Sequence, residues 1–243
     1  MLNQPLIAID FGSSAIKVME LSGRGQKKLR AIGLETLPAG AIVDGVIQAQ
    51  EDVENTLSAL LKKLKIGTRA RRAAISLGGS VVKLKRIDVP VSADADIGEQ
   101  VFYEAEQHFD LDISEIYFDF WKLTPGPNEN GEQPVLLVGA KRDTVEQYVS
   151  CLRGAGLRTG VVDCDVISAS NMFEYNYGVV DGLVALINIG ASNTQVSILS
   201  NGVHMYTRDV AIAGEDYTNQ ISDALGMERD SAEALKVDRK SVV

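Results

Sequence analysis

The stretch LIAIDFGSSAIKVMEL, residues 6–21, begins as an apolar strand and ends as a second one. Between the two strands an acid, Asp10, is followed after one residue by Gly12, Ser13 and Ser14. Glycine and serine are common in tight turns, so this stretch taken alone fits an ordinary hairpin. The same residues also suit an anion, because glycine lets the backbone approach a ligand, and N–H groups and hydroxyls donate hydrogen bonds to phosphate oxygens.

The composition is that of a globular protein without a nucleic-acid partner. The 243 residues are 45% hydrophobic and 23% charged, enough for a sizeable core in one large domain or two smaller ones. The formal net charge of -9 offers no attraction to phosphate backbones. The two cysteines, Cys151 and Cys164, form neither a metal motif nor a disulfide framework, so we expect buried, reduced thiols.

Targeting signals are not evident in the sequence. The first ten residues lack a basic region followed by an apolar run, and no apolar run approaches the roughly 20 residues of a membrane span. We therefore expect a cytoplasmic protein, or one that sits on a membrane without crossing it. Residues 238–243 back-translate to a string that looks like common sequencing-adapter DNA, so we interpret them as a non-native tail; the alternative is a genuine frayed end.

The hydrophobic pattern predicts an α/β protein. Three strands joined by turns at Gly12 and at residues 23–25 open the chain, and a helix and a strand then complete a parallel βαβ crossover. The predicted strands are residues 6–10, 15–21, 29–37, 73–77, 81–89, 117–123, 135–140, 157–163, 183–189, 194–199 and 203–210. The predicted helices are residues 51–65, 96–109, 143–155, 165–177, 215–225 and 230–237. We expect Gly156 at a helix C-cap and a tight turn at Asn201-Gly202.

Residues 81–141 differ in character from the sequence around them. They contain a strand, an amphipathic helix and a hairpin, which we interpret as a small inserted α+β subdomain. The hairpin connector, residues 124–134, is rich in Pro, Gly and Asn, and we expect it to be an exposed tip.

The opening pattern recurs late in the chain. Residues 10–18 and 188–196 align with coincident glycines, Gly12 and Gly190, which are 178 residues apart, the difference between the two positions. Each copy leads from an apolar strand into a second and then a third strand, which predicts two similar domains facing one another. Paired loops favour a nucleotide cleft over two unrelated turns. Hydroxyls of Ser13, Ser14 and Thr194 and the charge of Lys17 suit phosphates, and Asp10 suits a hydrated Mg²⁺, which takes one or two carboxylates.

The two copies resemble the first and second phosphate motifs of the actin, Hsp70 and sugar-kinase superfamily. Residues 213–218, AGEDYT, and 232–236, AEALK, look like the Gly-Gly-x-x-x-Thr and Ala-Glu-x-x-Lys pattern of its FtsA-like branch. Within that branch residues 6–237 most resemble the type IV pilus assembly protein PilM family, with further support from AAISLGGSVVKLKRIDVP, YEAEQHFDLDISEIYFDF, VLLVGAK and LRGAGLRTGVVDCD.

The resemblance implies an α/β, actin-like (ribonuclease H-like) fold with duplicated domains. It divides the chain into the first actin-like subdomain (1–80), the inserted α+β subdomain (81–141), the return of the first domain with the interdomain helix (142–178), an incomplete second actin-like domain (179–237) and the tail (238–243).

The resemblance also implies a role for each matching residue. Asp10 would order Mg²⁺ through water, the two hairpins would grip the phosphates of ATP, and the later residues would contact the sugar and adenosine. The implied cofactor-binding set is Asp10, Gly12, Ser13, Ser14, Lys17, Asn188, Gly190, Ser192, Thr194, Gly214, Glu233 and Lys236. Two positions depart from the family pattern: Asn188 replaces the usual Asp, and Ala213 replaces the first Gly. We therefore predict ATP binding with weak or absent hydrolysis.

Other candidate residues have plainer explanations. His108 and His204 lack a neighbouring Cys or paired acid in the sequence, which favours surface or core roles. Asp163 and Asp165 precede a helix where the superfamily often keeps a water-positioning residue, but N-capping by Asp165 is the simpler interpretation. The basic run at Lys62, Lys63, Lys65, Arg69, Arg71 and Arg72 is either a solvated helix end or a contact for anionic lipid or an acidic partner.

The family resemblance implies a cytoplasmic component of the type IV pilus machine, peripheral at the inner membrane. Its partners would be pilus inner-membrane assembly proteins, and a PilN-like cytoplasmic peptide would bind between the first subdomain and the inserted one. The alternatives are an FtsA-like cell-division protein, a phosphotransferase such as a sugar kinase, for which no catalytic Asp with a substrate domain is evident, and an adaptor with a decayed nucleotide site.

Overall fold

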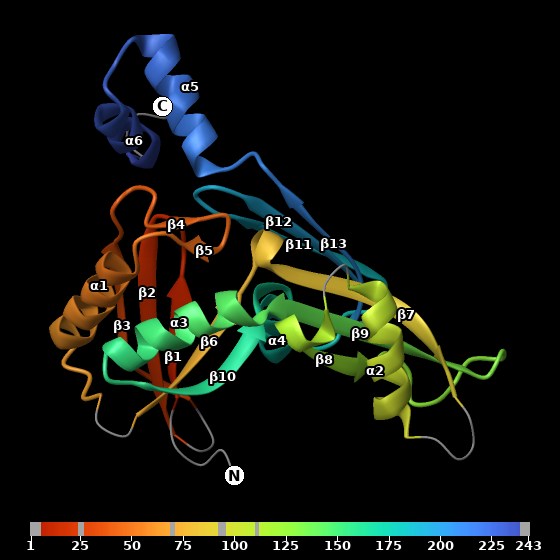
Figure 1. The fold of residues 1–243 in the computed structure, drawn as a ribbon. Helices are drawn as coiled ribbons and strands as arrows, with labels where there is room; N and C mark the ends of the chain where they lie inside the picture. The colour runs from red at the N-terminus through yellow and green to blue at the C-terminus, as the bar shows by residue number, and fades with distance from the viewer. Residues whose placement is uncertain (1–5, 24–26, 69–70, 92–95, 110–111, 239–243) are drawn as a thin grey trace.

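The computed structural model describes residues 6–23, 27–68, 71–91, 96–109 and 112–238. These residues form an α/β structure with three main sheets, each on a different part of the chain (Figure 1). No helix within the described ranges is both long enough and apolar enough to cross a membrane. The predicted turn at residues 23–25 and the predicted tail at 238–243 lie largely outside the described residues, with only Gly23 and Asp238 included.

The first sheet has five strands in the order β10-β6-β1-β2-β3. Strands β1 (Ile7–Phe11), β2 (Ala15–Ser22) and β3 (Lys28–Thr36) are antiparallel neighbours, whereas β6 (Arg72–Leu77) lies parallel to β1 and β10 (Arg158–Cys164) parallel to β6. The predicted parallel crossover is therefore confirmed. A short ribbon, β4 (Ile42–Val43) and β5 (Val46–Ile47), precedes the first helix.

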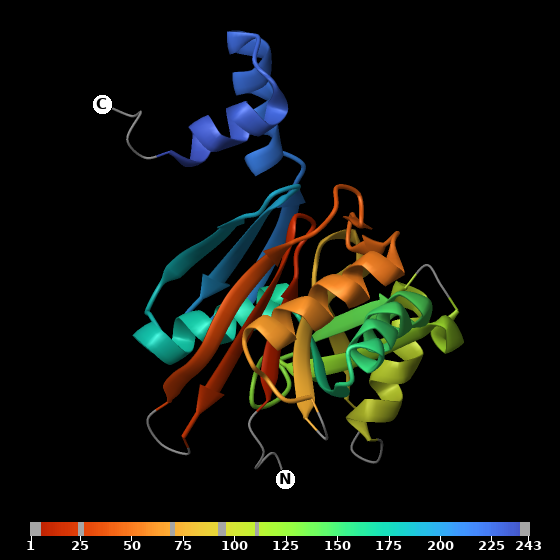
Figure 2. The same ribbon diagram turned by 90° about the vertical axis from the view of Figure 1, so that its left-hand side faces the viewer.

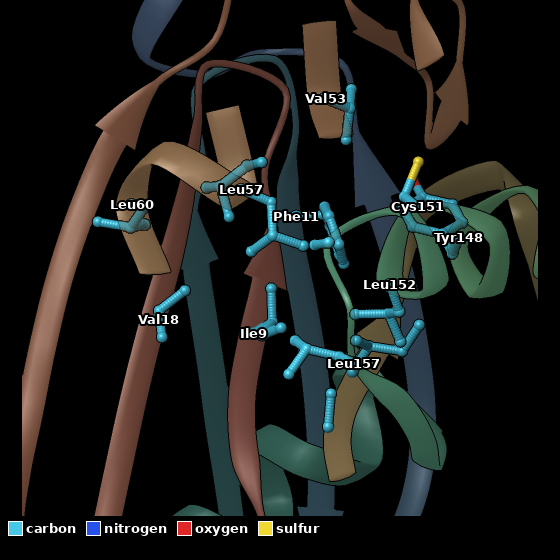
Figure 3. Close-up of a cluster of buried hydrophobic side chains, with 14 of the residues drawn as sticks. Ile9, Phe11, Val18, Val53, Leu57, Leu60, Tyr148, Cys151, Leu152 and Leu157 are labelled. Carbon is cyan, nitrogen blue, oxygen red and sulfur yellow. The ribbon is translucent and has the colours of Figure 1, made fainter. Parts of the chain in front are cut away.

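Two helices cover one face of this sheet, α1 (Gln50–Lys63) and α3 (Arg142–Gly154) (Figure 2). Helix α1 has acids in its first turn and lysines in its last, an arrangement that complements the helix dipole. Its buried residues Val53, Leu57 and Leu60 meet Ile9 and other strand residues in the main core (Figure 3).

Tyr148 of α3 anchors the same core. Its ring lies edge-on to Phe11, with centroids 5.3 Å apart, and its hydroxyl donates to the carbonyl of Gly45 at 2.9 Å. The core thus lies directly beneath the β1–β2 hairpin and fixes the position of that turn (Figure 3).

The inserted segment forms its own sheet, in the order β7-β9-β8, from β7 (Val82–Pro90), β8 (Ile116–Lys122) and β9 (Glu132–Lys141). Helix α2 (Ile97–His108) packs on it, and a separate apolar cluster that includes Val101 and Leu137 lies between them. Two short 3₁₀ turns, η1 (Gly79–Val81) and η2 (Ile113–Glu115), precede β7 and β8. The predicted β8–β9 hairpin is confirmed, and its connector is largely exposed.

The third sheet repeats the opening meander with β11 (Leu183–Ile189), β12 (Thr194–Ser200) and β13 (Val203–Val210). Helix α4 (Asp165–Tyr177) leads into it, and α5 (Gly214–Leu225) and α6 (Arg229–Val237) follow it. Asn201 and Gly202 both have positive φ, 50° and 78°, as the predicted tight turn requires. Figure 1 shows α5 and α6 beyond the ends of the strands.

Two predictions at helix ends are wrong. The C-cap of α3 is Ala155, and Gly156 follows it with a φ of 78°, because the left-handed residue of such an end lies after the cap. Asp165 is the first residue of α4 and makes no capping bond; the N-cap is Cys164. The acid that bonds the start of the helix is Asp163, which accepts from the N–H of Cys164 at 2.8 Å and from the hydroxyl of Ser168 at 3.1 Å.

Candidate functional site

The first hairpin is closed by its glycine. The N–H of Gly12 donates to the carbonyl of Ala15 at 3.0 Å, and a Cβ on Gly12 would approach that oxygen just as closely. Ser13 and Ser14 therefore form the tip. Asp10 and Lys17 lie directly opposite each other in the strands, and Lys17 Nζ is 2.7 Å from Asp10 Oδ2, with both side chains about half exposed.

The second hairpin has the same backbone geometry. The N–H of Gly190 donates to the carbonyl of Asn193 at 2.9 Å, and a Cβ on Gly190 would lie 2.8 Å from that oxygen. Ser192 is at the tip, and its hydroxyl donates to the hydroxyl of Ser13 at 2.9 Å. The two hairpins that the sequence repeat predicted to face each other are thus in contact through their tips.

The hairpins differ in the pair of residues behind each tip. Asn188 lies opposite Gln195, at the positions that Asp10 and Lys17 occupy in the first copy. An amide pair thus replaces an ion pair. The hydroxyl of Thr194 is already hydrogen-bonded within the protein, since it donates to the carbonyl of Ile212 at 2.6 Å.

The start of α5 is bonded to the second hairpin. The N–H of Gly214 donates to the carbonyl of Gly190 at 3.0 Å, and a Cβ on Gly214 would lie 3.2 Å from that oxygen. Ala213, the departure from the family pattern, is fully buried with a φ of -153°, which any residue adopts. Its N–H donates to the carboxylate of Asp216 at 2.7 Å, so alanine serves the turn without a second glycine.

Glu233 and Lys236 join α6 to α5. Lys236 Nζ donates to the carbonyl of Gly214 at 3.0 Å and pairs with Glu233 at 2.7 Å. The fully buried Thr218 lies 2.5 Å from Glu233 and 2.8 Å from Lys236, so its hydroxyl bridges the two. Hydrogen bonds from Lys236 and Thr218 hold the pKa of Glu233 below its usual value. Both residues therefore hold the two helices together close to Gly214.

Two carboxylates, Asp163 and Asp165, lie where β10 meets α4. Asp165 faces Gly78, where a Cβ would lie 2.0 Å from its Oδ2, so glycine is needed at that position. Burial raises the pKa of Asp165, and the negative charges of Asp10, Asp209 and Asp163 raise it further against the lowering effect of a hydrogen bond from Ser76. The negative charges that raise the pKa of Asp165 thus come from both halves of the chain.

The donor set fits a magnesium-bound polyphosphate better than a directly held metal. Among the described residues, no group of three or more His, Cys, Asp or Glu side chains is placed to hold a metal ion. Asp10 is about half exposed and contacts the ammonium of Lys17, and the hydroxyls of Ser13 and Ser192 lie at the hairpin tips in front of this pair. Hydrated Mg²⁺ needs only one or two carboxylates and takes its other ligands from water and phosphate.

The remaining predicted candidates have structural contacts. Burial raises the pKa of Cys151 to about 12 and of Cys164 to about 11, which leaves both as unreactive thiols. Buried His204 lies 2.6 Å from Thr207 Oγ1, and burial lowers its pKa, so it is neutral at pH 7. His108 lies 3.7 Å from Glu104 on α2.

Three of the six residues of the basic run are paired within the protein. Lys63 contacts Glu35 at 2.9 Å, Arg71 pairs with Glu20, and Arg72 donates to the carbonyl of Gly160 at 3.1 Å. Arg69 lies outside the described residues. For Lys63, Arg71 and Arg72 these contacts favour a structural role over a lipid or partner contact.

The structure also contains a groove whose lining residues were not predicted from the sequence. It is a groove of about 870 Å³ between the inserted sheet and helices α3 and α4. Tyr117, Phe120 and Trp121 of β8 line one wall, and Val149 and Asn171 lie on the other. Among the described residues strand β8 pairs with β9 alone, so its second edge has no strand partner there. The four aromatic residues within IYFDFW, residues 116–121, were the available signal.

Comparison with known proteins gives a matching family and several solved structures that share the fold of this chain. A family model described as type IV pilus assembly protein PilM matches residues 8–241. The cell division protein FtsA of Bacillus subtilis (strain 168) is 23% identical over 265 residues, covering 96% of this chain and 58% of FtsA. A solved PilM-PilN type IV pilus biogenesis complex superposes with a TM-score of 0.83 at 26% identity, covering 95% of this chain and 68% of that one. MreB5 of Spiroplasma citri bound to ADP has a TM-score of 0.51 at 14% identity, covering 96% of this chain and 62% of that one, and shares the fold alone.

The predicted actin-like fold is confirmed by these neighbours. The chain spans about 58% of the length of the curated relative and about 68% of the solved one.

Proposed function

Since the chain belongs to the family of the type IV pilus assembly protein PilM, and is an actin-like protein of that assembly, we propose that it binds ATP with Mg²⁺ between its two hairpins. The observation that carries the proposal is the hydrogen bond from Ser192 to Ser13, which brings two hairpins of equal geometry tip to tip. Two hydroxyls lie at the contact between the tips, and the ammonium of Lys17 and the carboxylate of Asp10 lie behind the first tip in the same hairpin. MreB5, which shares the fold, has been solved with ADP.

Each residue has a distinct part in this proposal. Ser13, Ser14 and Ser192 donate to phosphate oxygens, Lys17 neutralises their charge, and Asp10 accepts from the water shell of Mg²⁺. The metal supplies charge neutralisation at the phosphates. Asn188 cannot polarise a water as a carboxylate does, so we propose binding with weak or absent hydrolysis. Glu233 and Lys236 lie beside the nucleoside, and their ion pair also holds α6 against α5.

The experiment that tests ATP binding is a calorimetric titration of the protein with Mg-ATP. We expect saturable binding that Gly12→Arg abolishes, because a side chain at Gly12 meets the carbonyl of Ala15 and fills the space between the tips. Gly126→Arg is the matched control, since a Cβ at Gly126 meets nothing within 4 Å. A wild-type protein without saturable binding, or a Gly12→Arg variant that binds normally, would contradict the proposal and leave the alternative of an adaptor with a decayed nucleotide site.

We further propose that a PilN-like cytoplasmic peptide occupies the groove beside β8, as a partner at the inner membrane. The open edge of β8 can pair with an extended segment, and the aromatic wall suits its aliphatic side chains. Asp119, Glu146 and Glu174 line the same groove, so a basic residue in the peptide is favoured. The solved PilM-PilN complex supports a partner of this kind. Membership of the PilM family likewise favours the pilus machine over cell division.

Trp121 reports directly on this groove because it is the only tryptophan of the chain. We expect its fluorescence to shift to the blue as a synthetic N-terminal peptide of a PilN-like protein is added. Asn171→Arg, on the opposite wall, should abolish the shift, and Met172→Arg is the control because Met172 is exposed on the same helix outside the groove. An equal response in both variants would place the peptide elsewhere.

The two proposed sites share structural elements, so nucleotide and peptide should influence each other. The groove is lined by Asp163 and Cys164, beside the start of α4, and by Gly202 and His204 from the third sheet. A shift between the first and third sheets on nucleotide binding would change its width.

A further inference from the structure

A row of three polar residues crosses the third sheet behind the second hairpin. Asn188 of β11 lies opposite Gln195 of β12, which lies opposite Asp209 of β13. Directly opposed residues of antiparallel strands point to the same face, so the three side chains share one side of the sheet. Gln195 is only 7% exposed, and its Nε2 donates to Asp209 Oδ1 at 3.3 Å.

Asp209 lies across from the first sheet. It lines a cavity of about 510 Å³ together with Gly78 and Gly79, which follow β6, and with Val166 near the start of α4. Its charge acts on Asp165, as does the charge of Asp10. Asp10 lies three residues before Ser13, and Asp209 lies opposite Gln195, three residues after Ser192, so each repeat contributes a carboxylate behind the contact between the tips.

We propose that Asp209 is the carboxylate of the third sheet that orders water around nucleotide-bound Mg²⁺, in the place that Asn188 leaves neutral. The inference rests on the proposed ATP binding. Gln195 holds the Asp209 carboxylate by one oxygen, and within the described ranges no hydrogen bond to the other oxygen is found, so that oxygen can accept from a metal-bound water. Asp10 acts from the first sheet and Asp209 from the third, so the metal links the two. Asp209 is a positioning residue, because it acts through water and not on the phosphates.

A purely structural role for Asp209 would predict a different outcome. If Asp209 only braced Gln195, its loss would weaken β12–β13 packing and would change ATP affinity equally with and without metal. A role in ordering metal-bound water predicts a loss of Mg²⁺ affinity alone, because partners in the outer shell of a metal typically contribute about 10–100-fold to its affinity.

The test measures Mg²⁺ affinity at a fixed concentration of a fluorescent ATP analogue, and analogue affinity in EDTA. We expect Asp209→Asn to raise the Mg²⁺ concentration needed for half-maximal binding by about tenfold or more, with the EDTA value and the melting temperature unchanged. Adding Asn188→Asp to Asp209→Asn should restore the Mg²⁺ affinity, because it returns a carboxylate to the same row. Asp223→Asn, an exposed acid on α5, is the control.

The outcomes separate the two proposals. A wild-type protein that does not bind the analogue with Mg²⁺ refutes the proposed function and this inference together. Normal binding with an Mg²⁺ requirement that Asp209→Asn leaves unchanged, or a loss that is equal in EDTA, refutes the inference alone. Failure of Asn188→Asp to restore Mg²⁺ affinity also refutes it, since the two carboxylates would then not serve one position.

Discussion

The contact between the hairpin tips can be tested by cross-linking Ser13→Cys with Ser192→Cys. The two hydroxyl oxygens are 2.9 Å apart, so thiols at these positions meet. A hydrogen bond of this kind contributes about 0.5–1.5 kcal/mol net, which corresponds to about a 2–13-fold preference for the closed arrangement. We therefore expect a disulfide to form readily under mild oxidation.

The native cysteines should not interfere with this assay. Burial raises the pKa of Cys164 to about 11 and that of Cys151 to about 12, so at pH 8 about one thiol in 1,000 of Cys164, and fewer of Cys151, is a thiolate. An engineered cysteine at a hairpin tip, with a pKa of about 8.5, is about one quarter thiolate at that pH. The selectivity for the engineered pair is thus about 250-fold or more on ionisation alone.

The assay follows the disulfide by non-reducing electrophoresis over time, with Ser14→Cys and Ser192→Cys as the control pair. Ser14 lies one residue away in the same hairpin, so the control tests position and not general reactivity. We expect the Ser13 pair to react faster and Mg-ATP to slow it, since phosphates between the tips separate the thiols. Equal rates for the two pairs would refute the tip-to-tip geometry; a rate indifferent to Mg-ATP would count against nucleotide at this place.

Three further predictions concern stability. Gly78→Ala should destabilise the fold by about 1–3 kcal/mol in chemical denaturation, because its Cβ would clash with Asp165, and adding Asp165→Ala should recover most of this loss. Asp165→Asn should raise the melting temperature at pH 7, since a carboxyl whose folded pKa is raised costs stability when ionised; the gain should disappear as pH falls below the unfolded value near 3.8. Leu57→Ala, at a fully buried position of α1, should cost about 2–5 kcal/mol, and an unchanged denaturation midpoint would contradict the core assignment.

Most strands and helices were predictable from the sequence because their residues follow a simple periodicity. Helix α4 and strands β11 and β13 begin and end where the pattern predicted, and the other elements differ by a few residues at their ends. The facing of the hairpins was also predictable, because the duplication of Gly12 at Gly190 requires similar turns. The β4–β5 ribbon was missed although Asp44-Gly45 is a strong turn signal, and both residues have positive φ.

The unpredicted features depend on contacts between distant parts of the chain. Aspartate is a common N-cap residue, but Asp165 faces Gly78, which is 87 positions earlier by the difference of their numbers. Asp209 became a candidate only when strand register placed it opposite Gln195. Local propensity carries no information about which strand lies beside which, so these positions needed the structure.

The difference in charge between the two hairpins explains why nucleotide and metal would bind together under the proposed function. Lys17 is already paired with Asp10, but the pair is about half exposed, and exposed ion pairs contribute only about 0–1 kcal/mol. Mg²⁺ near Asp10 would offset the carboxylate charge and leave Lys17 available to a phosphate, so each partner gains a stronger contact at little cost. Asn188 and Gln195 are both neutral amides, so neither forms an ion pair with Mg²⁺ or with a phosphate. The second hairpin can therefore close on the phosphates through Ser192 without competing for the metal, and any carboxylate from its sheet must come from another strand.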